Sequence, residues 1–124
     1  MHNRDMTQIS TTIEVDDEEL RYLLITAIEG GTGYWAGVLE YDPGERGESD
    51  PHAVIVDLEE AEGGPWEDAP KIRLDLEFIA RGLQLWADAY PDRFQRYVAY
   101  DFDHDADDAD LIVQVAHFGK PVYG

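Results

Sequence analysis

Carboxylates at alternate positions of the segment DFDHDADDAD, Asp101–Asp110, are the side chains with the clearest capacity for chemistry. Such alternation is typical of an EF-hand calcium loop, whose sixth position is Gly and whose twelfth is a bidentate Glu. Counted from Asp101, these two positions hold Ala106 and Ile112. We therefore predict no metal and no cofactor, and we expect Asp107 or Asp108 to cap a following helix. The predicted acidic surface consists of Asp101, Asp103, Asp105, Asp107 and Asp108.

A second candidate segment is EGGTGYW, Glu29–Trp35, in which a carboxylate precedes three glycines and two aromatic residues. It is not a phosphate loop, because it lacks the closing Lys-Ser/Thr and follows a helical pattern. One interpretation is a helix-to-strand turn, in which Gly30 or Gly31 ends the helix in the left-handed conformation and the aromatic residues enter the core. The alternative is a nucleotide platform of glycine amides and aromatic faces, with Glu29 as a hydrogen-bond acceptor.

Asp110, Gln114 and Phe118 recur at i, i+4 and i+8, and so share one face of a predicted helix. A buried Gln needs partners, because an unpaired amide costs about 1–3 kcal/mol. Gln114 therefore either bonds to backbone at the edge of the core or faces a pocket beside Asp110. Glu29 with Asp110 could form an acid–base pair, but no nucleophile or cofactor motif accompanies them, and we predict a protein that is not an enzyme. The candidate binding residues are Glu29, Gly30, Gly31, Tyr34, Trp35, Asp107, Asp110 and Gln114.

The elements that must position these residues form one small α+β domain, residues 11–124, after a flexible leader, residues 1–10. We expect an antiparallel sheet of about three to four strands, with about three helices packed on one face. Strands are predicted from alternating or apolar runs at 11–15, 34–41, 52–60 and 71–76, with 121–124 as an edge strand. Helices are predicted from residue 16, capped by Asp16, from residue 76, capped by Asp75, and over 109–118, stopped by Gly119. The segment 92–100 is predicted as helical or extended.

The composition restricts the classes of partner. The chain has 124 residues, of which 28 are Asp or Glu and nine are Lys or Arg, and its net charge is −19. Such a surface repels nucleic acid and anionic membranes, so we predict no direct partner of either kind. The acidity has three interpretations: solvation in a salt-rich cytoplasm, mimicry of a phosphate array, or a metal-binding surface. The absence of cysteine excludes disulfides and thiol nucleophiles.

Two stretches, AIEGGTGYWAGV (Ala27–Val38) and DADDADLIVQVAHFGKPVYG (Asp105–Gly124), together resemble a group of small proteins encoded in phages and prophages. That group carries an E-G-G-x-x-Y-W segment and a D-A-x-D-A-D-x-I-V-Q-x-A-x-F-G-x-x-V-Y-G ending. Lys120 departs from the acidic residue expected at its position. The resemblance implies no particular activity, but it implies that these residues act together: Glu29, Gly30, Gly31, Tyr34, Trp35, Asp107, Asp110, Gln114, Phe118, Gly119, Tyr123 and Gly124.

Small viral proteins without a catalytic set are most often accessory or counter-defence factors. We therefore predict a cytoplasmic protein of the host cell that inhibits a nucleic-acid-handling defence complex through its acidic surface, as some anti-CRISPR and anti-restriction proteins do. The alternative is a protein that binds or sequesters a small nucleotide signal through EGGTGYW and the Asp110/Gln114 helix. A second alternative is a halophile-type acidic accessory domain. Homo-oligomers are compatible with each of these.

Overall fold

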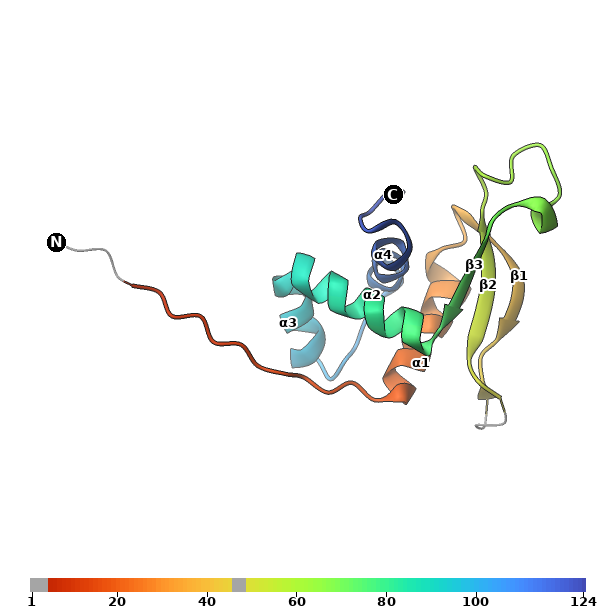
Figure 1. Ribbon diagram of the computed structural model, residues 1–124. Helices are drawn as coiled ribbons and strands as arrows, with labels where there is room; N and C mark the ends of the chain where they lie inside the picture. The colour runs from red at the N-terminus through yellow and green to blue at the C-terminus, as the bar shows by residue number, and fades with distance from the viewer. Residues whose placement is uncertain (1–4, 46–48) are drawn as a thin grey trace.

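A three-stranded antiparallel sheet forms one layer of the molecule, and the helices cover one of its faces (Figure 1). The computed structural model describes residues 5–45 and 49–124. The strands are β1 (Ala36–Asp42), β2 (His52–Asp57) and β3 (Lys71–Asp75), and β2 lies between the other two. The predicted small α+β fold is therefore confirmed.

The helical face of the sheet is apolar because alternate residues of neighbouring strands point the same way. Ala53 lies opposite Leu74 and Ile55 opposite Ile72, and all four side chains are buried in the main core. The opposite face carries a smaller cluster, in which the loop after β2 and its short 3-10 helix η3 (Trp66–Asp68) cover part of the sheet.

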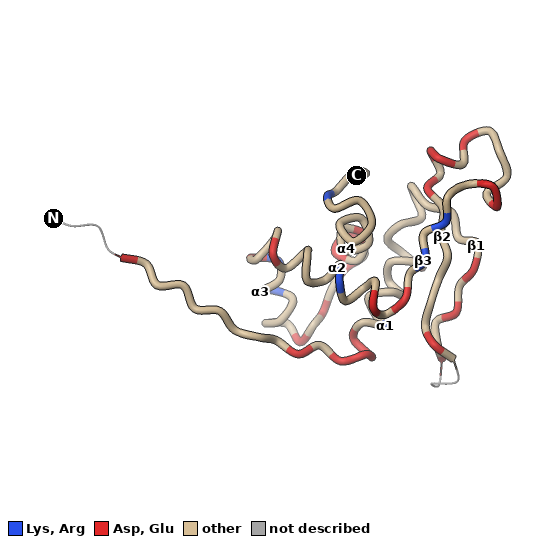
Figure 2. The backbone as a smooth tube through the Cα atoms, viewed as in Figure 1, with Lys and Arg blue, Asp and Glu red and all other residues tan. Residues whose placement is uncertain are grey.

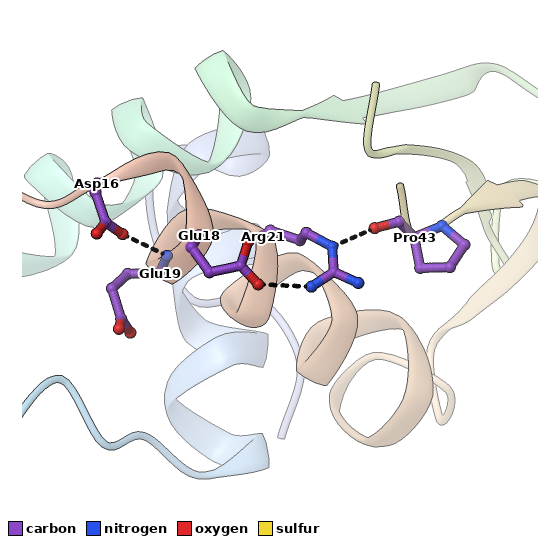
Figure 3. A network of polar contacts seen from close by, with 5 residues as sticks. All are labelled: Asp16, Glu18, Glu19, Arg21 and Pro43. Carbon is purple, nitrogen blue, oxygen red and sulfur yellow. Dashed lines mark hydrogen bonds and ion pairs between the residues drawn. The ribbon is translucent and has the colours of Figure 1, made fainter. Parts of the chain in front are cut away.

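The first helix, α1 (Asp17–Thr26), continues without a break into a π-helical turn, η1 (Ala27–Gly31). Asp16 caps it as predicted, since its Oδ1 accepts a hydrogen bond from the Glu19 amide at 3.0 Å (Figure 3). The prediction that Gly30 or Gly31 stops the helix in the left-handed conformation is wrong, because neither has a positive φ.

Three further helices follow the sheet. Asp75 caps α2 as predicted by accepting from the Phe78 amide at 2.8 Å. Gly119 closes the last helix at φ 79°, also as predicted. Pro91 lies in the first turn of the helix Pro91–Ala99. Its missing N–H costs no hydrogen bond there, because the N–H groups of a first turn have no partner within the helix. These helices are α2 (Leu76–Ala89), α3 (Pro91–Ala99) and α4 (Ala106–Phe118).

Several sequence predictions at the ends of elements are wrong. The cap of α4 is Asp105, whose Oδ1 accepts from the Asp108 amide at 2.8 Å, so neither Asp107 nor Asp108 is the cap. Helix α4 therefore begins at Ala106, three residues earlier than predicted. The segments 11–15 and 121–124, predicted as strands, lie outside the sheet and have no regular structure.

The core joins the helices to the sheet. Helices α2 and α4 approach closely because Gly82 has no side chain: a Cβ there would lie 2.6 Å from the Ile112 carbonyl oxygen.

Across residues 5–45 and 49–124, each helix is too short or too polar to cross a bilayer. The largest fully buried apolar side chains are Trp86, Leu23, Leu24, Ile55, Leu74, Ile79, Ile112, Val56 and Val113.

Candidate functional site

The seam between the EGGTGYW turn and α4 brings together the two segments that the sequence singled out. Asp110 lies on the inner face of α4, where only 6% of its surface is exposed. Its Oδ1 accepts a hydrogen bond from Trp35 Nε1 at 2.8 Å, and its Oδ2 accepts one from the Tyr34 hydroxyl at 2.6 Å. Both carboxylate oxygens are therefore used by the turn.

Gln114, one helical turn after Asp110, is completely buried and connects the seam to the C-terminal segment. Its Nε2 donates to Asp110 Oδ1 at 3.0 Å and lies 3.2 Å from the Tyr123 carbonyl oxygen. Its Oε1 accepts from the Val122 and Tyr123 amides at 2.7 and 2.8 Å. These contacts agree with the first interpretation, a Gln that bonds to backbone. Gln114 lies beside Asp110, but it is completely buried and does not line the hollow at the EGGTGYW turn.

Tyr123 closes the seam against the sheet. Its ring stacks on Trp35, with centroids 5.2 Å apart and planes at 12°. Its hydroxyl contacts both Asp57 oxygens at 2.8 Å and lies 3.1 Å from Glu59 Oε2, just beyond the end of β2. Burial, together with hydrogen bonds to these two carboxylates, raises the pKa of Tyr123 above its usual value. Partial burial and the bond to Asp110 likewise raise the pKa of Tyr34 to about 12. The prediction that both aromatic residues of the turn enter the core is wrong for Tyr34, which is 56% exposed, whereas Trp35 is buried.

The glycines of the turn serve close packing against α4. A Cβ on Gly31 would lie 2.8 Å from the Ala106 carbonyl oxygen and 3.3 Å from the Asp110 nitrogen. A Cβ on Gly30 would meet Ala106 at an ordinary 3.7 Å, and one on Gly33 would meet nothing within 4 Å. Gly31 is therefore the glycine that the seam requires, for its size and not for its dihedral angles.

Glu29 lies outside this network. Its Oε2 accepts a hydrogen bond from the Tyr41 hydroxyl of β1 at 2.5 Å, and its side chain is exposed. Burial and this bond raise the pKa of Tyr41. A hollow of about 260 Å³ lies beside Glu29 and the three glycines, with Ile28 and Tyr34 as its other walls. The hypothesised acid–base pair of Glu29 with Asp110 is not supported by any contact between the two carboxylates.

Asp107 is exposed on the outer face of α4 and makes none of the side-chain hydrogen bonds of the seam. Of the predicted binding residues, the structure therefore joins Tyr34, Trp35, Asp110 and Gln114 directly, with Gly31 as the packing contact. Sequence reasoning did not assign the Tyr123–Asp57 contact. The resemblance had pointed to Tyr123, whereas no local pattern marks Asp57.

A second arrangement lies at the start of α1, where two acid-rich segments that are distant in the sequence meet at Phe102. Glu14, Asp16 and Glu19 line a hollow together with Phe102, which belongs to the loop between α3 and α4. The same loop is fixed to α1 by His104, whose Nε2 lies 2.8 Å from Thr26 Oγ1. The two acid-rich segments therefore meet at Phe102, and we call their carboxylates together the acidic face. Glu14, Asp16 and Glu19 line the hollow with Phe102, and Asp101, Asp103 and Asp105 lie on the loop that carries Phe102. Asp103 and Asp105 line another hollow together with Arg93 and Arg96.

The loop that carries these carboxylates has an unusual backbone. Asp101 and Phe102 are consecutive residues with φ of 57° and 62°, in the left-handed region that a Phe seldom adopts. The Phe102 ring packs edge-on against Tyr97, with centroids 5.3 Å apart. This packing holds the turn, and the side chains of Asp101 and Asp103 on either side of Phe102 are exposed.

Comparison of the chain with protein-family models, with curated proteins and with solved structures finds no match. No group of three or more His, Cys, Asp or Glu side chains that could hold a metal ion occurs in the described ranges 5–45 and 49–124. Function is therefore argued from the seam and the acidic face themselves.

Proposed function

We propose that this chain is an accessory protein of viral or prophage origin, without enzymatic activity, that binds a host nucleic-acid-handling defence complex through the acidic face. The acidic face would occupy a basic groove that otherwise holds nucleic acid, as in inhibitors of the anti-CRISPR or anti-restriction type. The observation that carries the proposal is that Phe102, which lies between Asp101 and Asp103, lines one hollow with three acids of the other segment, Glu14, Asp16 and Glu19.

Figure 2 supports this reading, with acidic residues both where the chain enters α1 and in the loop that leads to α4. Their charges are little compensated within the protein. In the part of the chain that the structure describes, the ion pairs are Arg21–Glu18 at 2.8 Å, His52–Glu40 at 3.1 Å and Arg93–Asp108 at 3.9 Å. None of these ion pairs involves a residue of the acidic face, although Arg93 and Arg96 line the same hollow as Asp103 and Asp105. Asp16 and Asp105 are engaged as helix caps, so the carboxylates that neither cap a helix nor form an ion pair are Glu14, Glu19, Asp101 and Asp103.

Electrostatics gives such a surface a characteristic binding behaviour. A net charge of −19 attracts a basic groove over distances of about 10 Å at 0.1 M salt, which speeds encounter. The gain lies mainly in the association rate and disappears as salt screens the charges. Phe102, half-buried at the centre of the acidic face, would supply an apolar contact.

The nucleotide-binding alternative has less support from the geometry. Trp35 and Gln114 are buried, and the polar atoms of Asp110 and Gln114 already bond to one another, to the turn and to the C-terminal segment. At this predicted site a nucleotide would be left with the hollow beside Glu29, which holds no Arg or Lys for its phosphates. The halophile-type alternative uses the same acids without a partner, and the experiment below separates it from the proposal.

The test compares two variants of equal charge. One neutralises the acidic face, with Glu14→Gln, Glu19→Gln, Asp101→Asn and Asp103→Asn. The control neutralises four exposed acids of the loop after β2, with Glu60→Gln, Glu62→Gln, Glu67→Gln and Asp68→Asn. Each protein is expressed in bacteria that carry a CRISPR–Cas or a restriction system, and the plating of a targeted phage is counted.

We expect the wild-type chain and the control variant to restore plating in at least one of these strains, and the acidic-face variant to lose that effect. No rescue by the wild-type chain in any strain would refute counter-defence. Equal loss in both variants would show that total charge, and not this face, is what matters. An acidic accessory domain without a partner predicts no rescue by any of the three proteins.

A further inference from the structure

The N-terminal arm, residues 5–15, carries apolar side chains that its own chain leaves largely exposed in its first part, whereas residues 11–13 and Val15 line a hollow together with residues of α2 and α3. Met6 and Ile9 are 83% and 87% exposed, and Ile13 is 39% exposed. Figure 1 shows the arm as an extended strand-like segment that leads away from the helices. Its β-branched, alternating sequence favours a strand, yet it pairs with no strand in the described chain. The local sequence of this segment therefore favours a strand, whereas the fold of its own chain gives it no strand to pair with.

The sheet has a matching unpaired edge. Within the described residues β3 pairs with β2 alone, so its outer side presents free backbone N–H and C=O groups. Ile72 and Leu74 of β3 point to the core, whereas Lys71 and Arg73 are exposed on the opposite face. Arg73 makes no ion pair with a described residue.

We propose that the N-terminal arm of one copy of this chain adds as a fourth strand to β3 of a second copy. Extended segments commonly bind sheet edges in this way, since main-chain hydrogen bonds supply affinity and alternate side chains supply specificity. Exchange of the arm in both directions gives a closed two-fold dimer. The proposal does not rest on the proposed function.

The side-chain pattern of the arm fits this edge. In an extended strand Ile9 and Ile13 point to one face, and Thr12 and Glu14 point to the other. If the arm pairs with β3 so that its two isoleucines extend the apolar face of Ile72 and Leu74, Glu14 lies on the opposite face. That is the face that carries Lys71 and Arg73. A cross-strand pair of opposite charge on that face is favourable.

Charge also selects β3 over the other edge of the sheet. The outer strand β1 carries Glu40 and Asp42, which would repel Glu14 of an incoming arm. Lys71 and Arg73 put two of the nine basic residues of the chain on β3 (Figure 2). In a protein with a net charge of −19, this edge is therefore the one suited to an acidic strand.

The first experiment measures the mass of the intact protein by analytical ultracentrifugation over a range of concentrations. Ile9→Asp would place a charge among apolar side chains, and we expect it to raise the dimer dissociation constant about tenfold or more. Ser10→Asp adds the same charge on the polar face and should leave the constant within about twofold. Both positions are exposed, so folding is not at risk. A monomer at every concentration, or an equal response to both substitutions, would overturn the proposal.

The second experiment uses the absence of native cysteine. A chain with Thr12→Cys is mixed with a differently tagged chain with Arg73→Cys, and mixed-tag disulfides are counted after mild oxidation. The control mixes Thr12→Cys with Glu40→Cys on β1, which measures chance collisions. We expect a several-fold higher yield for the β3 partner. Equal yields would contradict the proposal, as would a double variant that forms its disulfide within a single chain.

Salt distinguishes this association from the proposed function. Two copies that each carry −19 repel one another, so added salt should strengthen the dimer. Binding of the acidic face to a basic partner should weaken under the same change. Loss of one behaviour can therefore be recognised while the other persists.

Discussion

The seam and the acidic face are both rich in carboxylates, yet their surroundings differ completely. In the seam, Asp110 is buried and each of its oxygens has a hydrogen-bond donor. On the acidic face, Asp101 and Asp103 are exposed and have no cationic partner among the described residues. Satisfied buried groups stabilise a fold, whereas exposed unpaired charges cost little to carry and are available to a partner. The comparison indicates a structural role for the seam, and it supports the proposal that the acidic face binds a partner.

Removal of the Asp110 carboxylate should have the largest effect on stability. Asp110→Ala leaves the buried donors Trp35 Nε1 and Gln114 Nε2 without their acceptor, and we expect it to lower the free energy of unfolding by about 3 kcal/mol. Asp110→Asn keeps an acceptor oxygen for these donors and should lose about 1 kcal/mol. Urea unfolding with an unchanged m-value measures both. Losses of similar size in the two variants would show that the negative charge, and not the hydrogen bonds, holds the seam.

Gly31→Ala should come next, with a loss of about 2 kcal/mol, because its new Cβ would lie 2.8 Å from the Ala106 carbonyl oxygen. Gly33→Ala is the matched control. It lies in the same turn with open space around it and should change stability by less than about 0.5 kcal/mol. The two are compared by thermal unfolding. If Gly31→Ala changes stability as little as Gly33→Ala does, the turn and α4 are not tightly packed.

These two glycines show what the sequence could and could not predict. The caps Asp16 and Asp75, the stop at Gly119 and the three paired strands follow from local patterns, and the structure confirms them. The reason for Gly31 is a neighbour on α4 that local sequence does not reveal. The Asp110–Gln114 pair could be predicted because the residues are one helical turn apart. The Tyr123–Asp57 contact could not, since 66 residues separate the two.

Tyr123→Phe should have a smaller effect than the seam variants. The ring keeps its stacking on Trp35, while the hydroxyl bonds to Asp57 and Glu59 are lost. We expect a loss of about 1 kcal/mol in urea unfolding, the usual value of a hydrogen bond that is partly open to water. If the free energy of unfolding falls as much as in Asp110→Ala, the contact of the C-terminal segment with Asp57 contributes as much to the stability of the seam as Asp110 does.

The pH dependence of Tyr34 offers a subtler test. Its pKa is raised from about 10 to about 12 in the folded state. A raised pKa contributes stability that is present below pH 10 and is lost as the pH rises through the folded value. We expect ultraviolet titration to show several tyrosines that ionise late, because the pKa values of Tyr41 and Tyr123 are also raised, and we expect Asp110→Asn to return Tyr34 alone toward its ordinary pKa. An unchanged titration curve in that variant would contradict the Tyr34–Asp110 bond.

The smallest effect on stability belongs to the acidic face. The variant with Glu14→Gln, Glu19→Gln, Asp101→Asn and Asp103→Asn should unfold within about 1 kcal/mol of wild type, because these side chains make few contacts with the fold. Because the substitutions relieve repulsion between like charges, we expect the free energy of unfolding to rise slightly and not to fall. A large loss of stability would show that these carboxylates stabilise the fold, as those of the seam do.

The most direct test of this division is the association rate with a purified defence complex that the wild-type chain inhibits, measured at rising salt. We predict fast binding that slows steeply with salt for the wild-type chain and for the variant neutralised in the loop after β2. The acidic-face variant should bind slowly, with little dependence on salt. Identical salt dependence in all three proteins would contradict the account.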